Sequence, residues 1–282
     1  MRLKDKVEYL WYKYNFTPKR DLGQNFLIDP HIVGKIIETL ELNKKDTILE
    51  IGAGTGVLTE KLVERGGRVI AVEVDKNLCK MLKQELKEYL NLKIICEDIT
   101  KISFDEEFKR AKSVKLAGNL PYYVASSILL DMVKKDWIKF MVVMVQREVA
   151  ERLLAKPGNK KRGKLTVLIN YYGQGKKIID VPPQAFIPSP KVGATLLKIE
   201  KSKRYGAKDE NNFFSIVKAA FSLRRKMLVN SLSKGLIIDK DLIKEKLENI
   251  GIDWKKRAED LTEKEFVSIS NSLEISEKVR NL

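Results

Sequence analysis

The sequence has few of the residues on which metal and nucleophilic chemistry most often depend. Among 282 residues there are two cysteines, Cys79 and Cys96, and a single histidine, His31. Two cysteines cannot form the disulfide framework of a small secreted domain, so we expect both to be inert packing residues in a reducing cytosol. One histidine cannot supply a histidine metal cluster or a Ser-His-Asp triad, and we place it on a helix surface. The sequence therefore predicts no metal site.

Long apolar runs are also missing. No stretch approaches the ~18–20 apolar residues of a membrane-spanning helix, which argues against a membrane protein. Residues 1–16, MRLKDKVEYLWYKYNF, are basic but lack the apolar core and small-residue cleavage site of a secretory signal. With 44% hydrophobic and 33% charged residues, the composition is that of a globular chain. We expect a cytoplasmic protein without a membrane partner, acting as a monomer.

Positive charge is present in clear excess. Lys and Arg number 54 against 38 Asp and Glu, a formal net charge of +16, and the sequence pI is about 9.6. Such a surplus attracts a polyanion and speeds association with it, which favours nucleic acid as the partner. A Lys-rich solvated surface from a compositionally biased genome is the alternative, and only the location of the charge separates the two.

Strand and helix patterns alternate through the first half of the chain, which predicts an α/β fold with a parallel sheet. Asp29 and Pro30 are suited to begin a helix as its N-cap and first residue. The predicted helices cover 31–40, 57–66, 77–90 and 126–136. The predicted strands cover 46–54, 68–75, 92–99, 113–122, 140–150, 165–173 and 193–200.

The composition changes near residue 205. Residues 201–212, KSKRYGAKDENN, are polar and without apolar periodicity, which is typical of a linker. Helical spacing follows at 213–221, 242–251 and 263–274. We therefore predict two domains, an α/β domain at 1–204 and a small all-helical domain at 205–282.

A glycine loop follows the first long strand, in EIGAGTGVLT at 50–59. Gly52, Gly54 and Gly56 allow a tight turn and a close approach of a ligand to the backbone. A nicotinamide fingerprint would require glycine where Val57 stands, and no proton-relay histidine is available, which disfavours a dehydrogenase. With the acidic Glu50 before it, the loop better suits a cofactor without a pyrophosphate, although a structural turn would also explain three glycines.

Two carboxylates end the next two predicted strands. Glu73 lies 21 residues beyond Gly52, a spacing that suits a carboxylate accepting both hydroxyls of a ribose. Asp98 closes the third strand, where a carboxylate can accept from an adenine amino group. Parallel strands bring these ends to one edge of the sheet, where ligands bind in open α/β folds. A helix cap or a surface charge is the alternative for each carboxylate taken alone.

The segment Asn119-Leu120-Pro121-Tyr122 follows the fourth strand at the same edge. The side-chain oxygen of Asn119 and the carbonyl of Leu120 can accept the two hydrogens of an exocyclic amine. Tyr122 can stack on a base, a contact worth ~1–3 kcal/mol. A proline turn with a packed tyrosine is the structural alternative.

These segments together resemble the ribosomal RNA adenine N6,N6-dimethyltransferases. The resemblance covers nearly the whole chain, and NLPY with the later FSxRRK segment is specific for the housekeeping small-subunit enzyme. Gly193-Ala194 and Leu223 depart from the family pattern, outside the proposed pocket. The matching segments are GQNFL at 23–27, EIGAGTGVLT, EVD at 73–75, EDI at 97–99, GNLPYY at 118–123, QREVAERLLAKPG at 146–158, PPQAFIPSPKV at 182–192, FSLRRKMLVNSL at 221–232 and AEDLTEKEF at 258–266.

The resemblance implies a Rossmann-like class I methyltransferase that uses S-adenosylmethionine. It also implies the substrate: two adjacent adenosines in a hairpin loop near the 3′ end of 16S rRNA, in small-subunit particles, with a role in ribosome biogenesis. The helical domain would bind RNA or the ribosome. Asn119, Leu120, Pro121 and Tyr122 match the catalytic positions, and Gln24 belongs to a loop over the active site. The cofactor-contacting positions are matched by Asn25, Leu27, Gly52, Glu73, Asp98 and Asn119.

Clustered cations outside this pocket are candidates for holding RNA. They are Lys156, Lys160, Lys161, Arg162 and Lys164 in one loop, Arg224, Arg225 and Lys226 in the second domain, and Lys19 and Arg20 beside GQNFL. Each cluster alone is also compatible with a solvated surface. A ribosome-assembly factor in which methylation is incidental remains a second hypothesis for the protein, although the intact NLPY segment argues against a relative without catalysis.

Overall fold

The computed structural model describes residues 1–108, 111, 113–121, 124–202, 205–223 and 225–273. Its strands are β1 (Phe26–Leu27), β2 (Thr47–Ile51), β3 (Arg68–Glu73), β4 (Leu92–Cys96), β5 (Val114–Asn119), β6 (Ile138–Gln146), β7 (Gly173–Val181), β8 (Phe186–Ile187) and β9 (Ala194–Lys201). Its helices are α1 (Leu3–Lys13), α2 (Pro30–Leu40), α3 (Val57–Arg65), α4 (Lys76–Glu85), α5 (Asp105–Phe108), α6 (Ala125–Lys134), α7 (Arg147–Leu153), α8 (Lys164–Tyr172), α9 (Glu210–Ala220), α10 (Leu228–Leu236), α11 (Lys240–Asn249) and α12 (Glu263–Ser272). Short 3-10 turns are η1 (Arg20–Leu22), η2 (Ile99–Lys101), η3 (Pro183–Ala185) and η4 (Ala258–Asp260).

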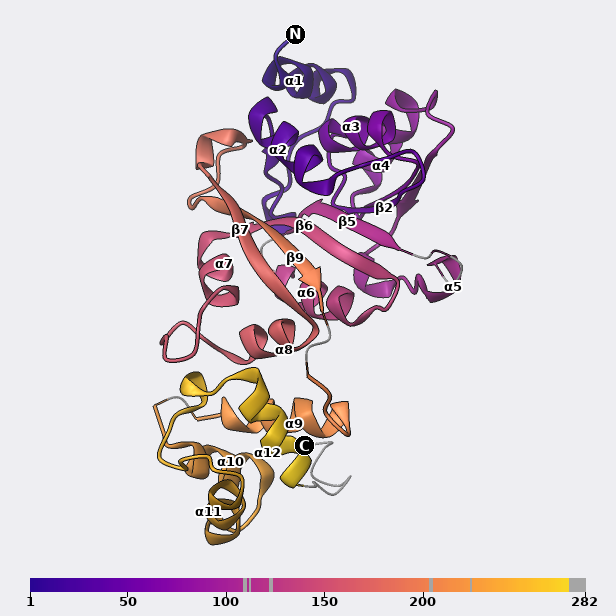
Figure 1. Ribbon diagram of the computed structural model, residues 1–282. Helices are drawn as coiled ribbons and strands as arrows, with labels where there is room; N and C mark the ends of the chain where they lie inside the picture. Colours follow the sequence, from indigo (N-terminus) through magenta and orange to yellow (C-terminus); the bar gives the residue numbers. More distant parts are fainter. Residues whose placement is uncertain (109–110, 112, 122–123, 203–204, 224, 274–282) are drawn as a thin grey trace. The chain divides into compact units, whose positions relative to one another are not determined.

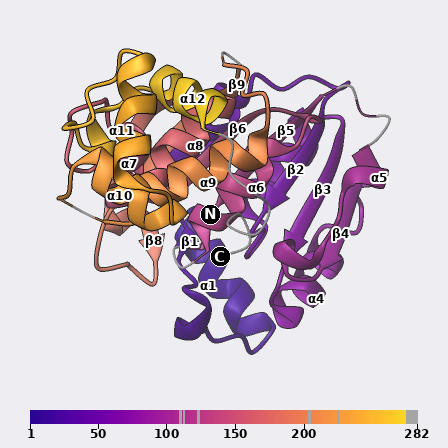
Figure 2. The ribbon, with the colours of Figure 1, turned by 90° about the horizontal axis from the view of Figure 1, so that it is seen from below.

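In the described chain, seven strands form one mixed sheet in the order β4-β3-β2-β5-β6-β9-β7 (Figure 1). Strands β4, β3, β2, β5 and β6 run parallel, and β9 pairs antiparallel with β6. Strands β2, β3 and β4 lie side by side in Figure 2. The order of the strands changes sides at β2: β3 and then β4 are added on one side of it, and β5 and then β6 on the other. This topological switch point is where open α/β sheets bind ligands.

The central strands are apolar because both faces of the sheet are covered. Four of the five residues of β2 are buried, as expected of a parallel strand between two layers of helices. Helices α2 and α3 cover one face and α6 lies on the other (Figure 1). On the first face, Ile36 of α2 and Leu62 of α3 belong to one core cluster with Ile48 and Val69 of the sheet. This core fixes the strand ends that carry the candidate site.

The predicted start of the first central helix is confirmed. Asp29 is the N-cap of α2, its Oδ1 accepts from the backbone N–H groups of His31 and Ile32, and Pro30 follows as the first helical residue. These bonds satisfy two donors that the helix itself cannot. The predicted strands at β2, β3, β4, β5, β6 and β9, and the helices at α3, α4 and α6, are also present. The strand predicted at 140–150 is too long, because β6 ends at Gln146 and α7 begins at Arg147.

The prediction of a strand at 165–173 is wrong, because this segment forms helix α8. Seven of its nine residues are buried, so the run is apolar on all sides. A short run of this kind does not distinguish a buried strand from a buried helix. In the helix, the ring of Tyr171 stacks on Phe213 of α9 at 4.3 Å between centroids. The strand comes afterwards, as the more polar β7.

The two cysteines are paired, contrary to the expectation of separate packing residues. Cys79 of α4 and Cys96 of β4 form a disulfide, with Cα atoms 5.9 Å apart. The short connection from α4 to β4 reverses the chain direction, so the end of β4 with Cys96 lies beside the first turn of α4, which carries Cys79. A separation of 17 residues in sequence did not indicate that contact.

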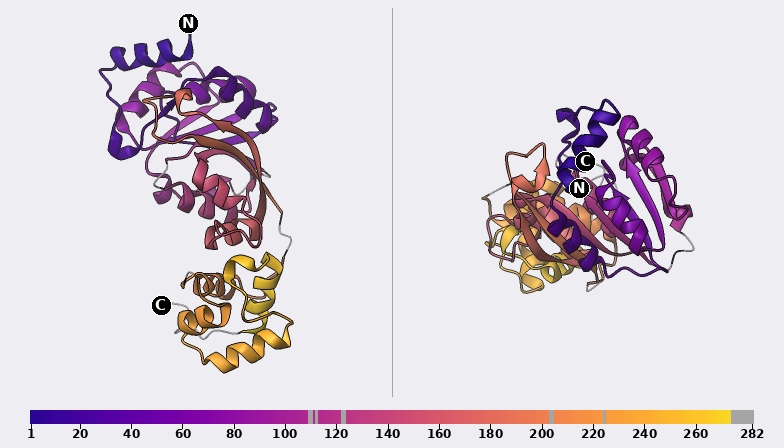
Figure 3. Two further views of the ribbon diagram at one scale, coloured as in Figure 1. Left: turned by 90° about the vertical axis from the view of Figure 1, so that its left-hand side faces the viewer. Right: turned by 90° about the horizontal axis from the view of Figure 1, so that it is seen from above.

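The chain divides into two compact units. The first comprises Met1–Ala150 and Gly175–Lys201, and the second comprises Glu151–Gln174 and the chain from Ser202 onward. The boundary predicted at 205 lies near the last crossing between them, but residues 151–174 group with the C-terminal helices. One reason is the packing of α8 against α9, as in the Tyr171–Phe213 contact. From α9 onward the regular elements in the described part of the second unit are helices joined by loops (Figure 3).

Candidate active site

The glycine loop begins directly after β2. Gly52, Gly54 and Gly56 have φ angles of +77°, +58° and +83°, in the left-handed region that L side chains rarely adopt. A Cβ on Gly52 would lie 3.3 Å from the carbonyl oxygen of Asn119, and one on Gly54 would lie 3.1 Å from the ring of Phe26. The conformation and the close neighbours both require glycine, and the backbone of Gly52 and Gly54 lines a pocket.

Glu73 ends β3 next to this loop and is 6% exposed. Its Oε2 accepts from the backbone N–H of Gly54 at 2.8 Å, and its Oε1 accepts from that of Asp75 at 3.0 Å. Burial raises the pKa of Glu73, against the effect of these hydrogen bonds. Each oxygen keeps capacity for another donor. Glu73 therefore both shapes the glycine loop and presents acceptors to a ligand.

Asp98 follows β4 and caps the short turn η2. Its Oδ1 accepts from the backbone N–H of Thr100 at 2.9 Å and from the Thr100 hydroxyl at 2.8 Å. These hydrogen bonds lower the pKa of Asp98 and keep it ionised. The cap considered as an alternative is thus present, yet the residue also lines the same pocket as Glu73. Its second oxygen gives it further acceptor capacity.

Asn119 is the last residue of β5. Its Nδ2 donates to the backbone carbonyl of Asn25 at 2.9 Å, which fixes the orientation of the amide and leaves Oδ1 as an acceptor. Leu120 is buried, and the carbonyl of Pro121 accepts two backbone N–H groups at the start of α6. Tyr122, the remaining residue of the segment, lies outside the described residues.

Residues 19–27, here called the strap, bind to Asn119 at the end of β5 and to Asp75 just after β3. Besides the Asn119 bond, Lys19 Nζ and Gln24 Nε2 lie 2.9 Å and 3.1 Å from Asp75 Oδ2. Leu27 lies in β1, which pairs with β8. Burial acts to raise the pKa of Asp75, but hydrogen bonds from Lys19, the Asn77 N–H and Gln24 outweigh it and lower that pKa.

Sequence reasoning missed Asp75. The signal that could have found it is its position before α4, where its Oδ1 caps the helix by accepting from Asn77. The same carboxylate changes the interpretation of Lys19. This cation was expected to face RNA, and the structure pairs it with the buried carboxylate of Asp75.

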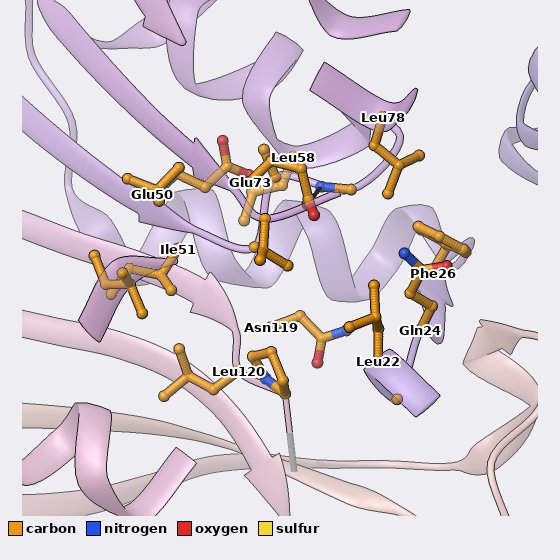
Figure 4. Close-up of a pocket in the computed structure, with 18 of the residues that line it drawn as sticks. Leu22, Gln24, Phe26, Glu50, Ile51, Leu58, Glu73, Leu78, Asn119 and Leu120 are labelled. Carbon is orange, nitrogen blue, oxygen red and sulfur yellow. Dashed lines mark hydrogen bonds between the residues drawn. The ribbon is translucent and has the colours of Figure 1, made fainter. Parts of the chain in front are cut away.

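One pocket joins these groups. Glu50 and Glu73 lie on one side of it and Asn119 and Leu120 on the other (Figure 4). Since β3 and β5 flank β2 in the sheet, the Gly52 turn separates the two sides. The structure brings to this pocket every predicted site residue that it describes: Asn25, Leu27, Gly52, Glu73, Asp98, Asn119, Leu120 and Pro121.

Glu50 is a further acidic group in this pocket. It is 1% exposed, and its Oε2 has no hydrogen-bond partner among the described residues. Burial raises the pKa of Glu50 to about 8, and the nearby Glu73 carboxylate adds to the effect. Near neutral pH the pocket floor thus carries a mostly uncharged carboxyl group. The glycine pattern pointed to Glu50, but its position in the pocket appears only in the structure.

The basic loop of the second unit is built around a buried arginine. The Arg162 side chain is 1% exposed, and its guanidinium donates to Glu263 Oε1 at 2.6 Å and to the carbonyl of Ala155 at 3.0 Å. Arg162 is therefore unavailable to RNA, and Lys161 pairs with Glu151. Lys156, Lys160 and Lys164 are exposed, as are Arg225 and Lys226. Arg224 and the side chain of Arg20 lie outside what the structure describes.

Neither a metal cluster nor a membrane-spanning helix occurs in the described part of the chain. Within those ranges, no group of three or more His, Cys, Asp and Glu side chains is placed to hold a metal ion. No helix there is long and apolar enough to cross a membrane.

The strand order, the glycine turn and the acidic ends of β3 and β4 define a Rossmann-like class I methyltransferase. Solved structures agree with this class. A dimethyladenosine transferase from Plasmodium falciparum superposes with a TM-score of 0.76 and 26% identity, covering 86% of this chain and 95% of that one. The 23S rRNA methyltransferase ErmE superposes with a TM-score of 0.67 at 22% identity, covering 88% and 99%, which supports the fold.

Sequence comparison is more specific. The family model for ribosomal RNA adenine dimethylase matches residues 15–274. Proteins named ribosomal RNA small subunit methyltransferase A are similar over 93% of this chain. The Clostridium botulinum (Type A) protein is 44% identical over 264 residues, 96% of its length, and the Halothermothrix orenii protein 42% identical over 270 residues, 90% of its length. The chain belongs to the ribosomal RNA adenine dimethylase family and is an rRNA methyltransferase.

Proposed function

We propose that this enzyme uses S-adenosylmethionine to dimethylate N6 of two adjacent adenosines near the 3′ end of 16S rRNA, in a hairpin loop of the small ribosomal subunit. The observation that carries the proposal is the placement of Glu73 and Asn119 on either side of the Gly52 turn in one pocket. Glu73 offers acceptors suited to ribose hydroxyls, and Asn119 offers one suited to an amine.

The pocket fits the donor in its chemistry. Gly52 and Gly54 have no Cβ where a ligand would approach the backbone. The two oxygens of Glu73, each held by one backbone N–H, would accept the ribose hydroxyls, and Asp98 would accept from the adenine amino group. Asn25 and Leu27 of the strap would close the site. When bound, S-adenosylmethionine supplies the electrophilic methyl group of a sulfonium.

The target amine would be held by Asn119 and Leu120. Adenine N6 is a poor nucleophile because its lone pair is delocalised into the ring. Hydrogen bonds from N6 to Asn119 Oδ1 and the Leu120 carbonyl would favour a pyramidal nitrogen and offset the positive charge that develops on it. The bond from Asn119 Nδ2 to Asn25 supports this role, because it keeps the amide oxygen available as the acceptor. Tyr122 would stack on the base.

No ionisable catalyst is needed in this scheme. The methylated ammonium form of adenine loses its proton readily to solvent. The residues instead contribute by alignment of N6 with the methyl carbon, an effect that can supply up to ~7–11 kcal/mol of the barrier reduction. A loop adenine also costs less to extrude than one in a stem.

The RNA would be held by exposed cations, including Lys156 and Lys160, and the helical domain at 205–282 would bind RNA or the ribosome. The ion pair of Arg162 with Glu263 supports this, because it fixes the loop that carries these lysines. We further propose that the protein acts in the cytoplasm as a monomer during ribosome biogenesis, without a metal. If it acts chiefly as an assembly factor, binding to immature subunits will matter more than turnover.

Methyl transfer to defined substrates tests the proposed function. The protein is incubated with labelled S-adenosylmethionine and either unmethylated small subunits or naked 16S rRNA, and the modified bases are mapped by mass spectrometry. We expect N6,N6-dimethyladenine at two adjacent positions near the 3′ end. Label at other bases, or tight binding to subunits without label, would contradict it.

A further inference from the structure

The N-terminal helix α1 lies before residue 15, where the match to the family model begins. It is nonetheless part of the first unit's core, since Val7 and Leu10 are buried in the same cluster as the helices around the sheet. Its partners indicate what this packing does.

Two ion pairs of α1, and a hydrogen bond from Tyr14 just after it, connect this segment to the helices that leave the donor site. Lys6 Nζ lies 2.6 Å from Glu60 Oε2 in α3, the helix that follows the glycine loop. Lys13 Nζ lies 2.7 Å from Glu85 Oε1 in α4, the helix that follows Glu73 and Asp75, and the hydroxyl of Tyr14 donates to the same oxygen at 2.6 Å. The contact with α3 lies in its first turns and the contact with α4 at its last residue, so α1 bridges the two helices whose first turns line the pocket.

An aromatic cluster connects α1 to the glycine loop itself. Trp11 and Phe16 both meet the ring of Phe26 edge-on, with centroids 5.6 Å and 5.9 Å away. Phe26 is 6% exposed, lines the pocket, and its ring lies where a Cβ on Gly54 would be only 3.1 Å away. The two edge-on contacts therefore hold the ring that bounds one side of the Gly54 turn.

The indole nitrogen of Trp11 is buried without a hydrogen-bond partner among the described residues. A buried unpaired N–H is unfavourable. The ring contacts, rather than the polar atom, thus account for the position of Trp11, and phenylalanine should preserve much of that contact.

We propose that α1 is a brace for the donor site and that Trp11 is a positioning residue, acting through Phe26 on the glycine turn. The inference rests on the proposed function in one respect, that the pocket takes S-adenosylmethionine. Loss of the brace loosens the Gly54 side of the pocket first, because Phe26 contacts that turn directly. Asn119 ends β5 and is held by the sheet as well as by its bond to Asn25. We therefore expect loss of the brace to weaken donor binding and raise the KM for the donor, with kcat at saturating donor little changed.

The test compares Trp11→Leu, Trp11→Phe and Tyr12→Leu. Tyr12 is the neighbouring aromatic, 87% exposed, and serves as the control. Binding of S-adenosylhomocysteine is measured by titration calorimetry, with donor KM and kcat alongside. We expect Trp11→Leu to raise Kd and KM about fivefold, the size of an aromatic contact, with kcat within about twofold. Trp11→Phe should recover most of the affinity, and Tyr12→Leu should bind as the unmodified protein does.

The outcomes separate this inference from the proposed function. If the unmodified protein does not bind S-adenosylhomocysteine, the proposed function fails. If it binds and Trp11→Leu binds equally well, or lowers kcat with KM unchanged, the brace is refuted. Should Trp11→Leu not fold, the double variant Lys6→Met, Lys13→Met decides. It removes the two lysine ion pairs, with Glu60 of α3 and Glu85 of α4, and keeps the Tyr14–Glu85 hydrogen bond. We expect weaker binding of S-adenosylhomocysteine, whereas unchanged binding would overturn the proposal.

Discussion

At the residue scale, the carboxyl groups of the pocket differ in protonation because their surroundings differ. Asp98 receives hydrogen bonds that lower its pKa, and so does Asp75, which binds the strap but does not line the pocket. Glu50 is almost fully buried with an unpartnered oxygen, and burial raises its pKa to about 8. A donor carrying a positive charge thus meets a site in which only some of the acids are ionised at neutral pH.

Glu50 makes the stability of the protein depend on pH. Its pKa in the folded state is above the ordinary value of 4.5, so between about pH 4.5 and 8 the folded state retains a proton that the unfolded state has released. The free energy of unfolding therefore falls as pH rises through this window, by about 1.4 kcal/mol per pH unit. We expect Glu50→Gln, measured by urea unfolding from pH 5 to 8 without donor, to flatten that fall. The exposed Glu88→Gln is the control, and an unchanged slope in Glu50→Gln would contradict the assignment.

At the element scale, the spacing of β2 and β5 next to the pocket depends on Gly118. A Cβ there would lie 2.5 Å from the backbone carbonyl oxygen of Ile51, a contact that no side-chain rotation relieves. We expect Gly118→Ala to force the strands apart, lowering stability by roughly 1–3 kcal/mol and weakening donor binding. Gly34, in the exposed interior of α2, has open space at the same position.

The matched variant Gly34→Ala should act in the opposite direction. Alanine suits a helix better than glycine, so we expect stability to rise by ~0.5–1 kcal/mol with unchanged donor binding. Thermal and urea unfolding of both variants check the pair. Equal effects of the two substitutions would show that the Gly118 contact does not set the strand spacing.

The strand ends were predictable from sequence, and the ties between distant segments were not. Glu73 and Asn119 each end a short apolar strand and Asp98 follows one, and a parallel sheet brings such ends to one edge. The bond of Gln24 to Asp75 joins residues 51 apart, and that of Arg162 to Glu263 joins residues 101 apart. The periodicity of apolar residues does not predict contacts between residues so far apart in sequence.

The wrong strand at 165–173 has a related cause. The segment is apolar on every side because α8 is buried among other helices, and the sequence alone does not say what surrounds it. Helix α10 was not predicted, because two serines and a lysine interrupt the apolar residues of LVNSLSKGL. Helix α1 of the first unit and strand β7, most of which belongs to that unit, were not predicted either. The alternation of strands and helices made only the central strands of the first unit predictable.

At the scale of the whole molecule, the net charge is +16, but only some of the positive side chains are accessible to RNA. Lys19 and Arg162 are held by the buried or nearly buried carboxylates of Asp75 and Glu263. Lys156 and Lys160 are exposed and have no acidic partner in the described chain. Counting cations therefore overstates the surface that RNA can use, and the free lysines are the candidates for phosphate contacts.

The salt dependence of RNA binding tests this distinction. Each phosphate contact contributes close to one unit to the slope of log affinity against log salt concentration. We expect Lys156→Ala and Lys160→Ala each to reduce the slope by about one unit. Lys177→Ala, which removes a lysine paired with Asp180, should change it less. Equal slopes for all three variants would indicate diffuse attraction and no defined contact.

The central claim is that one sheet edge holds the donor on the Glu73 side and the adenine amine on the Asn119 side. The most direct measurement is single-turnover methyl transfer to unmethylated small subunits by Asn119→Ala, together with its affinity for S-adenosylhomocysteine. The account predicts a rate at least about a hundredfold lower, as for loss of one transition-state hydrogen bond, with donor affinity changed far less. Asn119→Ala turning over at the full rate would contradict it.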